Sequence, residues 1–276
     1  MTDFFSTLPN RRAIIDRRDV ADRLEKVIAQ ADTYDATILR SRIVGVLGEA
    51  LIAGRAEALR RLYAHPTNGR ETVQAFAFLT DQILRILYDA TIHHLYNPGN
   101  RSKAEQMVLL AVGGYGRGEM APGSDVDIAF VTPYKPTAWT EQVIESMLYS
   151  LWDLGLKVGH SSRSVDEMIR MAKADLTVRT ALLEARYVWG DREVYDEARA
   201  RFGAEVVKDG ARAFVAEKLA ERDDRHKRMG DSRYVVEPNV KEGKGGLRDL
   251  QTLFWIGKYV NRVDNVAGLV EAGLLT

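Results

Sequence analysis

The chain has 276 residues, of which 46% are hydrophobic and 28% are charged, a composition typical of a folded globular protein. Lysine and arginine number 39, as do aspartate and glutamate, so no overall field attracts the chain to nucleic acid or to an anionic membrane. Any polyanion site must be local. The lack of cysteine excludes disulfides, thiolate metal sites and cysteine nucleophiles.

The sequence shows no pattern of a secretory signal or a membrane-spanning helix. The start, MTDFFSTLPNRR, lacks the basic and then apolar pattern of a secretory signal. No apolar stretch approaches the roughly 20 residues that a membrane-spanning helix needs. We therefore expect a cytoplasmic protein with no membrane partner. The last residues, LVEAGLLT, are amphipathic without a polar tail, which indicates a sequence cut from a longer protein.

The first part of the chain is predicted to be helical. Residues 11–63 are rich in Ala, Leu, Arg and Glu, with apolar residues at helical spacing, which predicts two or three helices. Residues 1–70 are assigned to an N-terminal helical region. After a loop at 65–70, apolar residues from Phe76 to Leu95 predict a long helix with one buried face.

Strand patterns follow in the middle of the chain. The apolar runs Met107–Val112 and Val126–Val131 predict two central strands. The segment between them leaves room for a helix of only a turn or two. A helix over 139–154, a third strand over 155–161 and a helix from Val165 complete a predicted domain at residues 71–195.

Residues 196–276 form a second predicted helical region. The run ARAFVAEKLAERDDRHKRMGD predicts a helix with solvent-exposed charged faces rather than a nucleic-acid contact. The loop VVEPNVKEGKGGLRD then precedes a helix from Leu247. Lys241, Lys244 and Arg248 in this segment fit either a triphosphate or partner contact, or a capped loop followed by a solvated helix start.

Two aspartates at the second strand carry the chemistry. Residues two apart on a strand point to the same face, so we expect Asp125 and Asp127 to project together while Val126 and Ile128 face the core. Two neighbouring carboxylates require a positive partner. Hard divalent cations such as Mg²⁺ prefer carboxylates together with substrate phosphate oxygens, which makes both aspartates candidate metal ligands and catalytic residues.

The glycines before the aspartates provide space for an anion. Gly113 and Gly114 allow a sharp turn and a close approach of backbone amides to phosphates. Arg117 is predicted to bind a phosphate in a bidentate manner, and Ser124 to donate a hydroxyl hydrogen bond. One segment would then hold phosphates and metal at adjacent points.

Other interpretations of the glycines fit less well. A dinucleotide-binding turn must open a long helix, and here Pro122 and a second strand follow too soon. A Walker loop needs Gly-Lys followed by Ser or Thr, which neither GGYGRG nor EGKGG contains. The remaining alternative is a tight turn with two surface aspartates.

The segment GGYGRGEMAPGSDVDIAFV resembles the signature of the DNA polymerase β-like nucleotidyltransferase superfamily. Together with LWDLGLKVGHSSRSVDE and EPNVKEGKGGLRDLQTLFWI, it is similar to the bacterial PII uridylyltransferase/uridylyl-removing family. The resemblance implies an α+β fold: a small mixed sheet flanked by helices, with helical N- and C-terminal extensions, the domain at 71–195 being the nucleotidyltransferase.

The same resemblance implies UTP as donor, Mg²⁺ as cofactor and a tyrosine hydroxyl of the PII signalling protein as acceptor, with pyrophosphate released. In that family a hydrolase domain, which removes the uridylyl group, and two glutamine-sensing ACT domains follow. The resemblance implies that these domains, and regulation by glutamine, lie outside this sequence. No nucleic-acid partner is expected.

The superfamily's third carboxylate is not evident. The candidate strand, residues 156–161, holds no acid, so Asp153 and Glu184 stay open as alternatives and the general base is unassigned. His160 is interpreted either as a base or uracil contact, or as a hydrogen-bonded histidine at a strand end. An adenylyltransferase with another acceptor and a nucleotide-binding sensor without turnover are the alternative functions.

Overall fold

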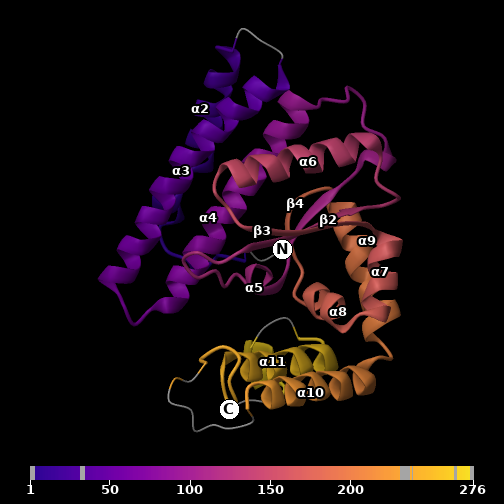
Figure 1. The fold of residues 1–276 in the computed structure, drawn as a ribbon. Coiled ribbons are helices and arrows are strands. Elements are labelled where there is room, and N and C mark those ends of the chain that lie inside the picture. Colours follow the sequence, from indigo (N-terminus) through magenta and orange to yellow (C-terminus); the bar gives the residue numbers. More distant parts are fainter. Residues whose placement is uncertain (1–3, 32–34, 231–236, 238, 264–265, 274–276) are drawn as a thin grey trace. The chain divides into compact units, whose positions relative to one another are not determined.

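The computed structural model describes residues 4–31, 35–230, 237, 239–263 and 266–273. Part of the predicted loop before the last long helix (residues 235, 236 and 238) and the end of the chain (274–276) lie outside the described residues. The chain divides into two compact units (Figure 1). The first comprises Met1–Met168 and Glu184–Asp196, and the second Ile169–Leu183 and Glu197–Thr276.

Helices form most of the first unit, as the sequence predicts. The helices of this unit are α1 (Arg11–Ile14), α2 (Arg17–Ala29), α3 (Ala36–Ala64), α4 (Gly69–Ala90) with a π-helical end (Thr91–Leu95), a 3₁₀ turn (Lys103–Glu105), α5 (Gly113–Gly116) and α6 (Ala138–Asp153). The helices α2, α3 and α4 begin after residues whose side chains accept amide hydrogen bonds: Asp16 from Arg18, Asp35 from Thr37, and Asn68 from Glu71, which is the usual role of an N-cap.

A four-stranded mixed sheet lies against these helices, which confirms the expected α+β fold. Its strands are β1 (Val108–Ala111), β2 (Val126–Thr132), β3 (Val158–Ser164) and β4 (Arg186–Gly190), in the order β3-β2-β1-β4. β1 pairs antiparallel with β2 and β4, whereas β2 pairs parallel with β3. The short α5 connects β1 to β2, so this antiparallel pair needs no long crossover.

Two details of the sheet differ from the sequence prediction. The third strand covers 158–164 instead of 155–161, because Gly155 adopts a φ of +71° directly after the cap of α6 and continues the turn. The fourth strand, β4, was not predicted. It begins with an arginine and ends with a glycine, so it lacks the wholly apolar run that marks a buried strand.

One face of the sheet forms the main core with helices α3, α4 and α6 (Figure 1). From β2, Val126, Ile128 and Phe130 belong to this core, which also includes Leu47, Leu84 and Met147 from the three helices. The remaining residues of β2 therefore belong to the opposite face, on which Asp127 is the first.

The regular elements in the described part of the second unit are all helices. It contains α8 (Leu176–Leu183), α10 (Ala211–Arg228), α11 (Leu247–Asn261) and α12 (Val266–Glu271), and a π-helical segment (Gly203–Val207); the chain passes between the units within α7 (Val165–Ala174) and α9 (Arg192–Phe202). Phe214 stacks on Tyr259 with ring centroids 4.0 Å apart. Within the described parts of the chain, no helix is both long and apolar enough to cross a membrane.

Candidate functional site

The two aspartates lie at the start of β2. Asp127 is its second residue and is half-buried, and Asp125 directly precedes the strand and is exposed. Val126 and Ile128 are each 1% exposed and belong to the core. Side chains alternate along a strand, so Asp127 points away from that core, as predicted. Asp125 lies outside the strand, so strand alternation does not fix the direction of its side chain, and its projection beside Asp127 stays a prediction.

The carboxylate of Asp127 lies between two glycines. A Cβ atom on Gly113 would be 3.4 Å from Oδ2, and a Cβ atom on Gly159 would be only 2.4 Å from Oδ1. Gly159 is the direct neighbour of Asp127 in the parallel β2–β3 pairing. A distance of 2.4 Å is far inside van der Waals contact, so the carboxylate occupies the space that a side chain at 159 would need.

Gly159 is a site residue that the sequence interpretation missed. The signal was present, because a glycine inside a strand pattern often marks the close approach of another group. The sequence interpretation used this strand only to look for a third acid. The structure shows that the strand position beside Asp127 is kept empty of a side chain.

The glycine turn borders the same carboxylate. Gly113 has a φ of +59°, in the left-handed region that favours glycine. The turn closes when Gly116 donates to the Val112 carbonyl at 2.9 Å, and Val112 itself donates to the Asp127 carbonyl at 3.0 Å. The amides of Gly113, Gly114 and Tyr115 begin the turn and therefore have no acceptor within it.

Arg117 lies against the turn but is held by two carboxylates. Its Nη1 donates to Glu184 Oε2 at 2.6 Å and its Nε to Glu119 Oε2 at 2.8 Å. Its Nη2 is 3.6 Å from the position of a Cβ on Gly114. Burial alone would lower the pKa of Arg117, but the two carboxylates raise it above its ordinary value. A phosphate contact by Arg117 thus stays a prediction, now restricted to Nη2.

Ser124 holds the loop that leads into Asp125. Its Oγ accepts a hydrogen bond from the Ala121 amide at 3.0 Å, and its own amide donates to the Ala121 carbonyl at 3.0 Å. The serine is exposed. Its hydroxyl proton takes no part in the bond from Ala121, so the expected contact to a substrate phosphate remains a prediction.

The open alternatives for a third acid lie in different surroundings. Asp153 ends α6 and is paired with Arg40 at 3.9 Å. Glu184 lies in the turn after α8, is 3% exposed and binds Arg117 through Oε2, while its Oε1 has no hydrogen-bond partner among the described residues. Within the described ranges, no group of three or more His, Asp or Glu side chains could hold a metal ion.

His160 belongs to the other side of β3 from Gly159. It pairs in register with the core residue Ile128, and its ring makes an edge contact with Trp152 of α6, with centroids 6.4 Å apart. Neighbouring residues on a strand face opposite sides. His160 therefore projects away from the face on which Asp127 lies, and the general base stays unassigned.

The glycine-rich loop of the second unit is closed by its own side chains. Asn239 accepts from the amides of Lys241 and Glu242 at 3.0 and 2.8 Å. Arg248 donates to Gln251 at 2.8 Å and to Glu242 at 3.3 Å. These contacts are those expected of the capped-loop interpretation.

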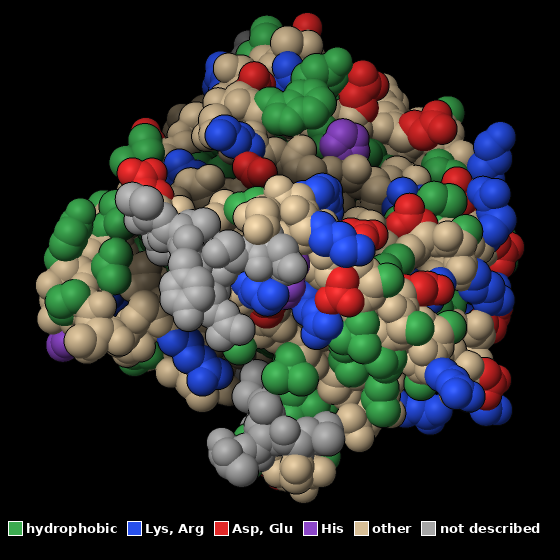
Figure 2. Space-filling view, turned by 60° about the horizontal axis from the view of Figure 1, so that its bottom comes forward, with side chains coloured by type: hydrophobic (Ala, Val, Ile, Leu, Met, Phe, Trp, Pro, Cys, Tyr) green, Lys and Arg blue, Asp and Glu red, His purple; other side chains and the backbone are tan. Residues whose placement is uncertain are grey.

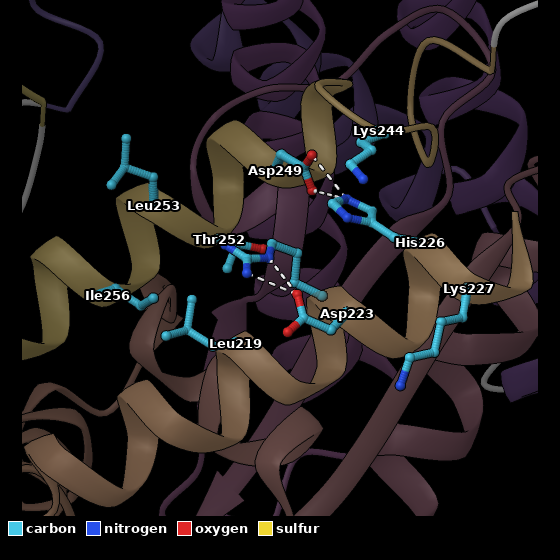
Figure 3. A pocket seen from close by; sticks show the side chains of 10 residues that line it. Leu219, Asp223, His226, Lys227, Lys244, Asp249, Thr252, Leu253 and Ile256 are labelled. Carbon is cyan, nitrogen blue, oxygen red and sulfur yellow. Dashed lines mark hydrogen bonds and ion pairs between the residues drawn. The ribbon is translucent and has the colours of Figure 1, made fainter. Parts of the chain in front are cut away.

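A groove of about 640 Å³ lies between α10 and α11 in the second unit (Figure 3). Lys244 and His226 lie at one end, and the apolar side chains of Leu219, Leu253 and Ile256 at the other. The His226 ring nitrogen Nε2 is 2.9 and 3.0 Å from the Asp249 oxygens. Figure 2 shows Lys and Arg side chains interspersed with Asp and Glu side chains across one face of the molecule.

Two family models match separate parts of the chain. Residues 101–188, which include the glycine turn, both aspartates and all of β1 to β3, match a model described as "Nucleotidyltransferase domain". Residues 213–276 match a model described as "GlnD PII-uridylyltransferase".

Curated relatives are similar over almost the whole chain. A protein of Novosphingobium aromaticivorans is 60% identical over 98% of the chain, one of Erythrobacter litoralis 59% over 100%, and one of Rhodospirillum rubrum 52% over 96%. Each is named "Bifunctional uridylyltransferase/uridylyl-removing enzyme". The chain spans 29%, 29% and 28% of the lengths of these relatives, respectively.

Proposed function

The chain belongs to the PII-uridylyltransferase family, and on that premise we propose that it transfers UMP from UTP to a tyrosine hydroxyl of a PII signalling protein. The observation that carries the proposal is the placement of the Asp127 carboxylate between Gly113 and Gly159, beside the glycine turn. Mg²⁺ prefers carboxylate ligands, and a glycine turn leaves room for a phosphate, so this arrangement supports the proposal.

The residues present fit a divalent cation. Asp125 and Asp127 offer carboxylate oxygens, the ligands that Mg²⁺ prefers, and both stand at the start of one strand. The bound metal would neutralise charge on the phosphates as the transfer proceeds. We place uridylyl removal, and the glutamine sensing that the family resemblance implies, in parts of the longer relatives that lie outside this chain.

The transfer exchanges one bond at phosphorus for another. The tyrosine oxygen forms a bond to the α-phosphorus of UTP, and the bond from that phosphorus to the oxygen bridging to the β-phosphate breaks. Pyrophosphate leaves with the bonding electrons, and the tyrosine proton passes to a base or to solvent. The chain would contribute mainly by positioning, with the amides of the Gly113–Gly114 turn and Arg117 Nη2 as the proposed donors that orient the phosphates.

The nucleotide-binding sensor is the second candidate. It is favoured by one observation, that the described residues contain no group of three acids or histidines able to hold a metal ion. The two candidates differ in turnover. A sensor would bind UTP but release no pyrophosphate when PII is present.

The proposal is tested with a uridylylation assay that contains UTP, Mg²⁺ and PII. We expect Asp125→Asn and Asp127→Asn to lower turnover by at least about 100-fold, because removal of preorganised charge stabilisation commonly costs that much. Asp196→Asn is the matched control: its carboxylate pairs with Arg192 on the exposed surface of α9, at 3.0 Å, and turnover should stay within about twofold.

Three results would contradict parts of the proposal. Wild-type turnover by Asp125→Asn would remove the metal assignment. If the wild-type chain binds UTP but releases no pyrophosphate with PII present, the chain is a sensor and not a transferase. If ATP competes better than UTP for binding, ATP and not UTP is the donor.

A further inference from the structure

A buried polar network supports the glycine turn from within the first unit. Tyr115 of the turn donates its hydroxyl to Asp81 Oδ1 of α4 at 2.7 Å. Arg186, the first residue of β4, donates to both oxygens of the same carboxylate, at 2.7 and 2.9 Å. Asp81 is 0%, Tyr115 2% and Arg186 9% exposed, so this network is shielded from water.

Arg186 also binds the backbone of the turn. Its Nε donates to the Gly116 carbonyl at 3.2 Å and its Nη2 to the Tyr115 carbonyl at 3.3 Å. One planar guanidinium therefore joins α4 to two consecutive peptide groups of α5. A fork of fixed geometry restricts the backbone in a way that a flexible lysine ammonium does not.

Aromatic rings from the start of the chain cover the other side of Arg186. The Cζ atom of its guanidinium is 4.6 Å from the ring centroid of Phe4 and 5.2 Å from that of Phe5. Phe4 also packs where a Cβ of Gly118 would be, at 2.5 Å from its Cε1. The turn and the residues that follow it are thus held from several directions.

Two members of the network, Tyr115 and Arg186, keep their protons at neutral pH. Burial, reinforced by the nearby Asp81 carboxylate, raises the pKa of Tyr115 well above its ordinary value, so the hydroxyl keeps its proton and remains a donor. Burial alone would lower the pKa of Arg186, but Asp81 raises it above the ordinary value. Tyr115 and Arg186 therefore remain hydrogen-bond donors across the neutral pH range.

Stability alone does not account for such a network. A buried ion pair is often no more stabilising than well-packed apolar residues of the same volume. What the network does is to fix geometry: Gly116 closes the turn, and Gly113 at its start borders the Asp127 carboxylate. A small displacement of the turn would change both the space for phosphates and the position of that carboxylate.

We propose that Arg186 is a positioning residue for nucleotidyl transfer, which acts through the Gly113–Gly116 turn with Asp81 and Tyr115 as its partners. The inference rests on the proposed function, because it assumes that phosphates bind beside this turn. Arg186 does not touch the substrate. It keeps the turn in the conformation that receives the triphosphate next to Asp127.

The test uses Arg186→Lys, which keeps the positive charge but loses the planar guanidinium and its paired hydrogen bonds. We expect the dissociation constant of UTP with Mg²⁺, measured by calorimetry without acceptor, to rise by about tenfold, and kcat/KM to fall by about 100-fold, because a displacement of about 1 Å can cost that factor. Tyr115→Phe removes one hydroxyl and keeps the ion pair, so it should raise the UTP dissociation constant by about threefold.

Arg61→Lys is the matched control in the same unit. Arg61 is 7% exposed, pairs with Glu57 at 2.9 Å, and donates to the carbonyls of Pro9 and Asn10 at 2.8 and 2.9 Å. Arg61→Lys therefore loses a comparable set of hydrogen bonds, and the midpoint temperature of its thermal unfolding should fall by about as much as that of Arg186→Lys. Its affinity for UTP should stay unchanged.

The outcomes separate the inference from the proposed function. Equal effects of Arg186→Lys and Arg61→Lys on UTP affinity, or no effect of either, would overturn the positioning role. Should Arg186→Lys fail to fold, Tyr115→Phe decides: unchanged UTP affinity and KM in that variant overturn the inference. A wild-type chain that binds no UTP would instead overturn the proposed function.

Discussion

Two glycine pairs in this chain stand at the start of a helix, and they differ in what surrounds them. Gly113–Gly114 opens α5 in the first unit, and Gly245–Gly246 precedes α11 in the second. Each pair contains a glycine with positive φ, +59° at Gly113 and +80° at Gly245. From the residue types alone, both segments are candidates for a phosphate-binding turn.

The difference lies in the position of the nearby aspartate. Gly245 donates its amide to Asp249 Oδ2 at 2.7 Å, so the loop is closed by a carboxylate from its own helix. Leu247 and Arg248 donate to carbonyls of the preceding loop at 2.9 Å each. At the other pair, Asp127 comes from a neighbouring strand and lies beside the turn. The two glycine pairs thus differ in whether an aspartate of the same helix closes the loop or an aspartate from a neighbouring strand lies beside it.

The largest predicted effect that sharpens this comparison comes from Gly159→Ala. Its new Cβ would fall 2.4 Å from Asp127 Oδ1 and would force the carboxylate to move. We expect Mg²⁺-dependent turnover to fall by about 100-fold, because small displacements of reacting groups cost that much. The assay is uridylylation over a range of Mg²⁺ concentrations.

Gly45→Ala controls for the loss of a glycine. Gly45 lies in α3, and its new Cβ would meet nothing within 4 Å. The substitution should leave turnover unchanged and should raise stability by about 1 kcal/mol, because alanine favours helices more than glycine does. Full activity in Gly159→Ala would show that the observed position of the Asp127 carboxylate is not required for catalysis.

A smaller effect is expected from a matched pair of substitutions at the two turns. Gly113→Ala and Gly245→Ala both place a side chain at positive φ, which should cost each unit about 1 to 2 kcal/mol of stability. Only at Gly113 would the new Cβ approach the Asp127 carboxylate, at 3.4 Å; at Gly245 it meets nothing within 4 Å. Gly113→Ala should therefore lower kcat/KM for UTP by about tenfold.

Thermal unfolding and steady-state kinetics on both variants check this pair. A decrease in kcat/KM of the same size in Gly245→Ala would show that the second glycine pair also serves the transfer. The distinction between the two turns would then be wrong.

The smallest predicted effect on activity belongs to Asp249→Asn. Asp249 pairs with Arg225, and its oxygens lie 2.9 and 3.0 Å from His226 Nε2. Loss of its charge should destabilise the second unit by about 2 kcal/mol without a change in UTP affinity. Burial raises the pKa of Asp249, but the Gly245 amide, His226 and Arg225 outweigh it and hold that pKa below its ordinary value of 3.8.

The pH dependence follows from that direction. A carboxyl group whose pKa is lower in the folded state stabilises the fold above its unfolded pKa. The stability difference between wild type and Asp249→Asn should therefore be full above about pH 4 and should disappear as the pH falls through the folded pKa. Denaturant unfolding at several pH values measures it; a difference that persists at the lowest pH would contradict the ionic role.

Much of the fold was predictable because its signals are local. The helices of the first unit and the strands at Val108–Ala111 and Val126–Thr132 follow from periodicity and from capping residues. β4 was missed because its five residues become a strand only through pairing with β1. Glu184, an open alternative for the third acid, binds Arg117, a contact between residues far apart in sequence that no local pattern reveals.

The sequence by itself determined the chemical types at the site: a glycine turn, then two acids alternating with buried Val126 and Ile128, because residues close together in the chain fix both the turn and the strand alternation. Only the tertiary structure decided which groups surround Asp127. Gly159 is brought beside it by a parallel pairing, and Asp81 and Arg186 reach the turn from α4 and β4. These contacts join distant segments, and pairwise packing in three dimensions is not encoded in any single stretch of residues.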